Sequence, residues 1–177
     1  MNIANKLTFM RMVLVPVFVL FMYLPGDNYR MIATIIFVAA SFTDFLDGYL
    51  ARKNGLVTTF GKFADPLADK ILVASAIILL SELGIIPGWT VIVIIAREFA
   101  ITGFRVIAAS ENITIAAGPL GKIKTATQMV GIILILLNYT PLVKIGIILY
   151  YISVFFTILS GVDYIVRNKE VLDLENI

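Results

Sequence analysis

Cysteine and histidine are both absent from this sequence. The lack of cysteine excludes disulfide bonds, thiolate metal sites and cysteine nucleophiles. The lack of histidine excludes the commonest general base and every catalytic dyad built on an imidazole. Any proton transfer or metal binding therefore has to use carboxylates.

Charged residues are scarce too: they make up 15% of the 177 residues, while 60% are hydrophobic. A soluble domain of this composition would carry more apolar surface than its exterior tolerates. Because a helix crosses a membrane with about 20 mostly apolar residues, this length allows roughly six crossings with short connections. We therefore expect one all-α membrane domain spanning residues 1–177. The net charge of +2 gives no reason to expect a nucleic-acid partner.

Apolar runs separated by turn signals such as Pro25-Gly26 and Gly118-Pro119 predict six transmembrane helices. The runs cover residues 12–24, 31–51, 66–83, 88–109, 122–139 and 142–166. Ahead of them, residues 2–11 place Ile3, Leu7 and Met10 at helical spacing among polar side chains, which predicts a short amphipathic helix at the membrane interface. A polar lead-in that anchors the first crossing explains this spacing equally well.

Basic residues are distributed unevenly along the chain. Ten lie at the termini or near the connections after the second and fourth runs, whereas only Arg30 and Lys144 lie on the opposite side. Since basic residues favour cytoplasmic loops, we expect both termini and the functional site at the cytoplasmic face of the cell membrane.

Four aspartates interrupt the second run and the start of the third: Asp44, Asp47, Asp65 and Asp69. A carboxylate at membrane depth costs about 2.5–3.5 kcal/mol by insertion scales, so such residues are candidates for function. Their spacings of three and four residues place both members of each pair on one helix face. The short connection between the two runs predicts antiparallel neighbours, so all four carboxylates should converge. Such a cluster of hard oxygen ligands favours two Mg²⁺ or Mn²⁺ ions over zinc.

The residues beside these acids fit a phosphate-bearing ligand. Gly48, Ala51 and Gly61 leave room for a bulky group near the helix backbone. The Arg52 guanidinium suits phosphate oxygens. Each feature has a structural alternative: small residues also pack helices, a terminal arginine also anchors a helix, and Asp65 before a proline also resembles an N-cap.

The combined spacing resembles the signature of the CDP-alcohol phosphatidyltransferase family, with every specified position present: Asp44-x2-Asp47-Gly48-x2-Ala51-Arg52-x8-Gly61-x3-Asp65-x3-Asp69. The resemblance implies a homodimeric enzyme of phospholipid biosynthesis that transfers a phosphatidyl group from CDP-diacylglycerol to a small alcohol. It implies metal binding by the four aspartates, with Asp69 also the general base. It implies nucleotide contacts at Asn5, Thr8, Gly48, Ala51, Arg52, Thr58 and Gly61.

Four flanking segments are similar to the bacterial phosphatidylglycerophosphate synthases of this family: Asn5-Lys6-Leu7-Thr8-x2-Arg11, Phe63-x-Asp65-Pro66-x-Ala68-Asp69-Lys70, Ala96-Arg97-Glu98 with Arg105, and Gly121-Lys122-x-Lys124-Thr125. This similarity implies sn-glycerol 3-phosphate as the acceptor. Cationic groups must then bring a dianion to a site rich in carboxylates, and Arg105, Lys124 and Lys122 are the candidates. Their alternative role is topological, as basic residues of a cytoplasmic connection. Arg97 is expected to pair with an acid such as Glu98.

Three other functions remain open on this pattern. A member of the same family could use inositol phosphate or serine as the acceptor. A divalent-cation or proton-coupled transporter also needs carboxylates inside the membrane, but the acids lie toward one face and no inverted repeat is visible in the sequence. A structural membrane subunit leaves the four paired acids unexplained.

Overall fold

The computed structural model describes the backbone of residues 3–54, 59–110, 113, 115 and 118–168; within these ranges the side chains of residues 3–7, 44–54, 59–66 and 110 are not described. The described part of the chain consists of six helices and contains no strand, which confirms the all-α prediction. The helices are α1 (Ile3–Tyr23), α2 (Asp27–Asn54), α3 (Thr59–Glu82), α4 (Gly88–Ser110), α5 (Pro119–Leu136) and α6 (Thr140–Arg167).

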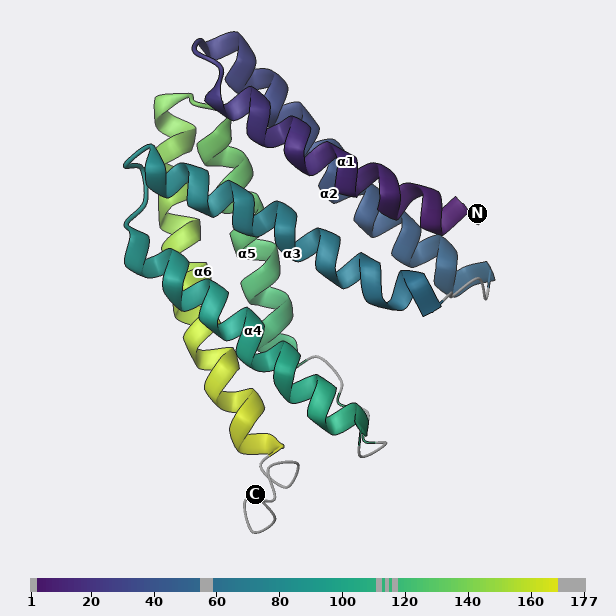
Figure 1. Cartoon of the computed structure of the whole chain (residues 1–177). Coiled ribbons are helices and arrows are strands. Elements are labelled where there is room, and N and C mark those ends of the chain that lie inside the picture. The colour runs from purple at the N-terminus through teal and green to yellow at the C-terminus, as the bar shows by residue number, and fades with distance from the viewer. Residues whose placement is uncertain (1–2, 55–58, 111–112, 114, 116–117, 169–177) are drawn as a thin grey trace.

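Consecutive helices run in opposite directions (Figure 1). Helices α1, α3 and α5 begin, and α2, α4 and α6 end, at one end of the bundle, which we call the N-terminal end. The connections α1–α2, α3–α4 and α5–α6 lie at the opposite, far end. Toward the N-terminal end α3 diverges from α4, so that α1, α2 and α3 form one group and α4, α5 and α6 another.

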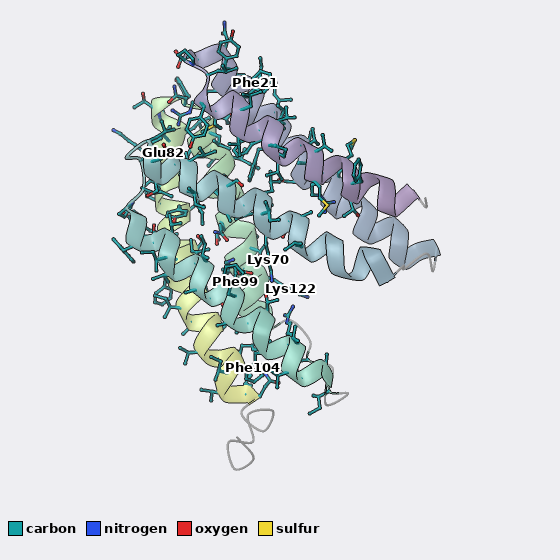
Figure 2. All side chains as sticks on the ribbon, in the orientation of Figure 1. Phe21, Lys70, Glu82, Phe99, Phe104 and Lys122 are labelled. Atoms are coloured by element: carbon teal, nitrogen blue, oxygen red, sulfur yellow. The ribbon has the colours of Figure 1, made fainter. Side chains whose placement is uncertain are left out.

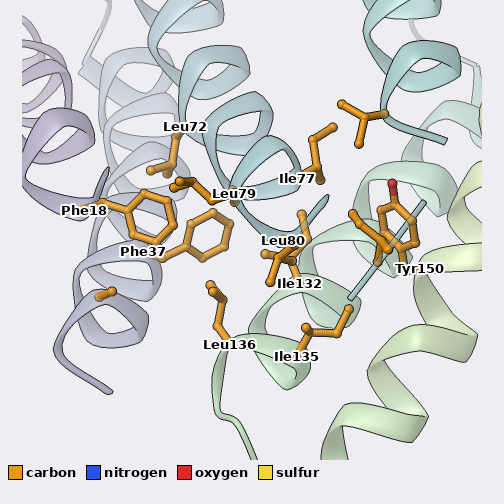
Figure 3. Close-up of a cluster of buried hydrophobic side chains, with 14 of the residues drawn as sticks. Phe18, Phe37, Leu72, Ile77, Leu79, Leu80, Ile132, Ile135, Leu136 and Tyr150 are labelled. Atoms are coloured by element: carbon orange, nitrogen blue, oxygen red, sulfur yellow. The ribbon is translucent and has the colours of Figure 1, made fainter. Parts of the chain in front are cut away.

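The hydrophobic core lies toward the far end, where the two groups meet (Figure 3). Phe18 of α1 and Phe37 of α2 pack with their ring centroids 5.6 Å apart. Leu80 of α3, Ile135 of α5 and Tyr150 of α6 are each fully buried in the same cluster. Because dispersion contacts and apolar burial are concentrated here, this end holds the bundle together and the N-terminal end is free to carry polar groups.

Polar contacts reinforce the far end. The Asn138 amide donates to the Asp27 carboxylate at 3.0 Å and so joins the α5–α6 connection to the start of α2. The Tyr23 hydroxyl donates to Glu82 at 2.7 Å, which joins the ends of α1 and α3. Figure 2 shows Glu82 and Phe21 at this end, whereas Lys70 and Lys122 lie nearer the middle of the molecule.

Helices α5 and α6 approach closely at two glycines. A Cβ added to Gly146 would lie 2.8 Å from the carbonyl oxygen of Gly131, and one added to Gly131 would lie 3.0 Å from the carbonyl oxygen of Gly146. Small residues at such a crossing let two backbones touch, which is how helices associate without a hydrophobic driving force.

The structure corrects one prediction about a helix start and decides against one alternative. The predicted amphipathic segment at residues 2–11 is not a separate helix, because α1 continues without a break from Ile3 to Tyr23. Helix α3 begins at Thr59, so Asp65 lies inside the helix and is not its N-cap. In both places a polar composition suggested a boundary, but the helix continues through it, and α3 also continues past Pro66.

The outer surface is strongly apolar. Phe99, Ile92 and Phe155 are 74%, 69% and 62% exposed, and further large hydrophobic side chains are exposed on every helix. Contiguous apolar surface of this kind is typical of contact with a membrane or a partner. Within the described residues two helices, α5 and α6, are long and apolar enough to cross a membrane, and residues 8–23 of α1 form a shorter apolar helix.

Candidate functional site

The helix bounds place the four aspartates at two matching depths. Asp44 lies ten residues before the end of α2 and Asp69 ten residues after the start of α3, about 15 Å along each helix. Asp47 and Asp65 lie seven and six residues from the same helix ends, about 10 Å along. Asp44 and Asp69 thus lie at the same depth from the helix ends that adjoin the α2–α3 connection, and so, within one residue, do Asp47 and Asp65. The side chains of Asp44, Asp47 and Asp65 lie outside the described residues, and the described side chains alone form no group of three or more metal ligands.

Asp69 is described, and it lines a cavity of about 580 Å³ between α3, α4, α5 and α6. The half-buried Asp69 carboxylate therefore joins the aspartate-bearing helices to this cavity. Charged side chains line the cavity from all four helices: Lys70, Arg97, Arg105 and Lys124 are basic, and Asp69, Glu98 and Asp163 are acidic.

Glu98 of α4 is the centre of the charged cluster in this cavity. Its Oε1 accepts from Lys124 Nζ at 2.7 Å and from Arg97 Nη1 at 3.1 Å. Its Oε2 lies 3.9 Å from Lys70 Nζ, which also donates to the Thr102 hydroxyl. One carboxylate thus contacts three cationic side chains, which come from three helices. The excess positive charge gives the cluster the electrostatics of an anion site.

Arg97 reaches across to α6 as well as to Glu98. Its Nη2 donates to the Ser160 hydroxyl at 3.2 Å, and Gly121 and Gly161 pack against its side chain. A Cβ added to Gly161 would lie 3.2 Å from Arg97 Cγ. The predicted pairing of Arg97 with Glu98 is confirmed, and these contacts hold the guanidinium in one place beside the cavity.

Arg105 lies two helical turns beyond Glu98 on α4. Its Nε donates to the Tyr164 hydroxyl at 3.1 Å, and its guanidinium carbon lies 5.5 Å from the centre of the same ring. Stacking and the hydrogen bond orient the planar fork at the cavity wall. Asp163 beside it is paired with Arg167 at 2.7 Å.

The three predicted acceptor ligands have different surroundings. Lys124 is only 5% exposed and Arg105 is exposed, and both line the cavity. Lys122 is exposed and is not among the residues that line it. The structure therefore brings Arg105 and Lys124 to the cavity that contains Asp69, and leaves Lys122 beside it.

The predicted nucleotide contacts lie mostly outside the described residues. Thr58 is in an undescribed segment, and Asn5, Gly48, Ala51, Arg52 and Gly61 are placed only by the backbones of α1, α2 and α3. Thr8 is described and is 1% exposed on α1. Its position is one turn from Arg11, which is fully buried.

Sequence reasoning missed Lys70, Glu98 and Gln128 as members of this site. The available signal was that each is a polar residue inside an apolar run, where polar groups are costly unless they have a role. What the sequence did not supply was the alignment of α3, α4 and α5 that brings these side chains to one cavity.

Comparisons with known proteins agree with the motif. A family model described as CDP-alcohol phosphatidyltransferase matches residues 1–159. The chain is 42% identical to the CDP-diacylglycerol–glycerol-3-phosphate 3-phosphatidyltransferase of Bacillus subtilis, with 99% of each chain covered. It is 41% identical to the Haemophilus influenzae protein of the same name, over 99% of this chain and 97% of that one. It is also 41% identical to a probable phosphatidylglycerophosphate synthase of Mycobacterium tuberculosis, over 94% of this chain and 81% of that one.

Proposed function

Because this chain belongs to the CDP-alcohol phosphatidyltransferase family, we propose that it transfers the phosphatidyl group of CDP-diacylglycerol to sn-glycerol 3-phosphate, giving phosphatidylglycerol phosphate and CMP. The relatives named for this reaction support the choice of acceptor. The observation that carries the proposal is the cationic cluster around Glu98, which shares one cavity with Asp69. An acceptor that is itself a phosphate needs such a cluster, whereas serine does not.

Two divalent cations, Mg²⁺ or Mn²⁺, would be held by Asp44, Asp47, Asp65 and Asp69. The donor set supports this choice: all four proposed ligands are carboxylates, and they lie at similar depths from the adjoining ends of α2 and α3. Bound there, the ions would neutralise the pyrophosphate of CDP-diacylglycerol and the departing CMP.

Asp69 acts as the general base in this proposal. The primary hydroxyl of glycerol 3-phosphate attacks the phosphorus that bears the diacylglycerol, a new phosphorus–oxygen bond forms, and the bond from that phosphorus to CMP breaks. The hydroxyl proton passes to the Asp69 carboxylate. Asp69 suits this step because its side chain lines the cavity that also contains the cationic cluster.

The acceptor phosphate is bound by Lys124 and Arg105, with Arg97 and Lys70 adding positive charge. Glu98 offsets one of the three cations around it, so the rest of their charge is available to a dianion. Lys122 contributes at longer range from the cavity edge. On the other substrate, Arg52 binds phosphate oxygens of the CDP group while Gly48, Ala51 and Gly61 leave room for it, and Asn5, Thr8 and Thr58 complete the nucleotide site.

The protein spans the cell membrane with all six helices, with both termini and the cavity mouth on the cytoplasmic side. The exposed apolar surface supports this placement, and so does the excess of basic residues at the N-terminal end. The lipid tails of CDP-diacylglycerol then remain in the bilayer while its head group enters the polar site. We also propose a homodimer, which rests on the family resemblance alone.

The test is CMP release from CDP-diacylglycerol by the purified protein in detergent, with glycerol 3-phosphate, inositol phosphate, serine and choline compared as acceptors. We expect release that requires Mg²⁺ or Mn²⁺ and is fastest with glycerol 3-phosphate. Faster release with another alcohol would overturn the acceptor while leaving the transferase intact. If no CMP is released with any acceptor, the result would favour the alternative that the protein is a transporter.

A further inference from the structure

Gln128 is a buried polar residue that lines the cavity and whose side-chain nitrogen has no partner among the described residues. It is 2% exposed, it lies on α5 and it lines the cavity. Its side-chain Nε2 has no hydrogen-bond partner in the part of the chain that the structure describes. The Nε of Arg97, which lies on α4 and lines the same cavity, is also buried and has no hydrogen-bond partner among the described residues.

Leaving such an amide unpaired is costly, and an apolar residue of similar size would fill the space without that cost. The position therefore points to a polar group that enters the cavity from outside. An amide both donates and accepts hydrogen bonds, which is also true of an alcohol hydroxyl. A phosphate only accepts, and the cations around Glu98 already suit it.

The place of Gln128 on the helix fits a ligand that also reaches the cationic cluster. Gln128 follows Lys124 by four residues, so the two side chains share one face of α5 and lie about 6 Å apart along it. Lys124 is fixed by Glu98 at 2.7 Å. A small molecule with a phosphate at Lys124 would thus have the neighbouring part of its carbon chain beside Gln128.

We propose that Gln128 binds the secondary hydroxyl of the acceptor and thereby selects a polyol phosphate over a simple hydroxyalkyl phosphate. This inference rests on the proposed function, because it assigns a further group of the same acceptor. Gln128 is a specificity residue in this account. It neither takes the proton from the attacking hydroxyl nor contacts the CDP group.

The experiment compares two acceptors in one reaction with purified full-length protein: sn-glycerol 3-phosphate and 3-hydroxypropyl phosphate, which keeps the primary hydroxyl and the phosphate but lacks the secondary hydroxyl. The ratio of the two lipid products gives the ratio of kcat/KM values and does not depend on the fraction of active protein. The variants are Gln128→Met, which keeps the volume, and Gln128→Asn, which keeps the amide on a shorter side chain. The matched control is Thr127→Val, because within the described residues the Thr127 hydroxyl donates to the α5 carbonyls of Ile123 and Lys124 and does not line the cavity.

We expect the parent and Thr127→Val to prefer glycerol 3-phosphate by about tenfold or more, the usual size of one buried hydrogen bond that is lost. Gln128→Met should reduce that preference to near unity by slowing the reaction of glycerol 3-phosphate alone, and Gln128→Asn should reduce it in part. An unchanged product ratio in Gln128→Met would overturn the inference. A variant that weakens only the affinity for CDP-diacylglycerol would also overturn it. A parent protein that uses neither acceptor would instead refute the proposed function.

Discussion

Asp69 is the residue at which the two parts of the proposed site meet, since it belongs to the aspartate motif and also lines the cavity. An asparagine in its place keeps the shape and one oxygen ligand but cannot accept a proton. We expect Asp69→Asn to reduce kcat by about 10²–10⁴-fold, the usual effect of losing a positioned base, with a smaller change in CDP-diacylglycerol affinity. Glu82→Gln, at the far end of α3, is the control. A loss of only a few-fold with an unchanged pH–rate profile would refute the role.

Asp44 and Asp65 should behave differently, because their proposed role is to balance the charge of the metal ions. Asp44→Asn or Asp65→Asn should lower activity and raise the Mg²⁺ concentration needed for half-maximal rate, so that added Mg²⁺ restores part of the loss. Titrations of activity against Mg²⁺ measure this directly. A variant that matches the parent in both quantities would remove that aspartate from the metal site.

The cationic residues should separate the two substrates. A charge-assisted contact to phosphate contributes about 1.5–3 kcal/mol, or roughly 10- to 150-fold in affinity. Arg105→Ala or Lys124→Ala should therefore raise the KM for glycerol 3-phosphate by that factor and leave the KM for CDP-diacylglycerol nearly unchanged. Arg52→Ala should instead raise the KM for CDP-diacylglycerol and leave the KM for glycerol 3-phosphate nearly unchanged.

Steady-state kinetics of these variants should be compared with Lys144→Ala, an exposed residue at the far end. Lys122→Ala should have the smallest effect of the three acceptor candidates, because Lys122 is exposed at the edge of the cavity. If Arg105→Ala and Lys124→Ala weaken both substrates equally, the assignment of a separate acceptor phosphate site fails.

At the scale of helices, the crossing of α5 and α6 fixes the position of Lys124 relative to α4 and α6. Gly146→Ala places a methyl group 2.8 Å from the Gly131 carbonyl oxygen, and the two backbones must move apart. Overpacking of this kind costs about 1–3 kcal/mol, so the thermal unfolding midpoint in detergent should fall. Gly103→Ala is the matched control: no described atom lies within 4 Å of its added Cβ, and alanine favours the helix. Equal midpoints for the two variants would contradict the close packing.

The six helices were predictable because their apolar runs are long and each is bounded by glycine, proline or asparagine. The starts of α1 and α3 could not be predicted in this way. Hydropathy alone begins each helix at its apolar run, whereas the structure extends the two helices through residues 3–11 and 59–65. The aspartate motif could be recognised because two pairs of acids, three and four residues apart, lie on consecutive helices. The sequence predicted only one contact of the Glu98 cluster, that with Arg97, which is adjacent in the chain. Lys70 and Lys124 reach Glu98 from α3 and α5, and these contacts depend on the tertiary fold. Gln128 stood out only as a polar residue inside an apolar run, and its place in the cavity required the tertiary fold.

At the scale of the whole molecule, the two ends of the bundle have different tasks. The far end is packed and closed by polar contacts between connections. The N-terminal end carries the aspartates, the cavity and most basic residues. The proposed function accounts for this division, because a transferase that joins a lipid to a charged, water-soluble acceptor needs an apolar flank for the one and a polar site for the other.

The measurement that tests the central claim most directly follows the acceptor into the lipid product. Purified protein is supplied with CDP-diacylglycerol, Mg²⁺ and sn-glycerol 3-phosphate labelled on its phosphate, and CMP and lipid-soluble label are counted together. We predict one labelled lipid for each CMP released, and neither product when the divalent cation is chelated. CMP released without label in the lipid, or no CMP at all, would contradict the account.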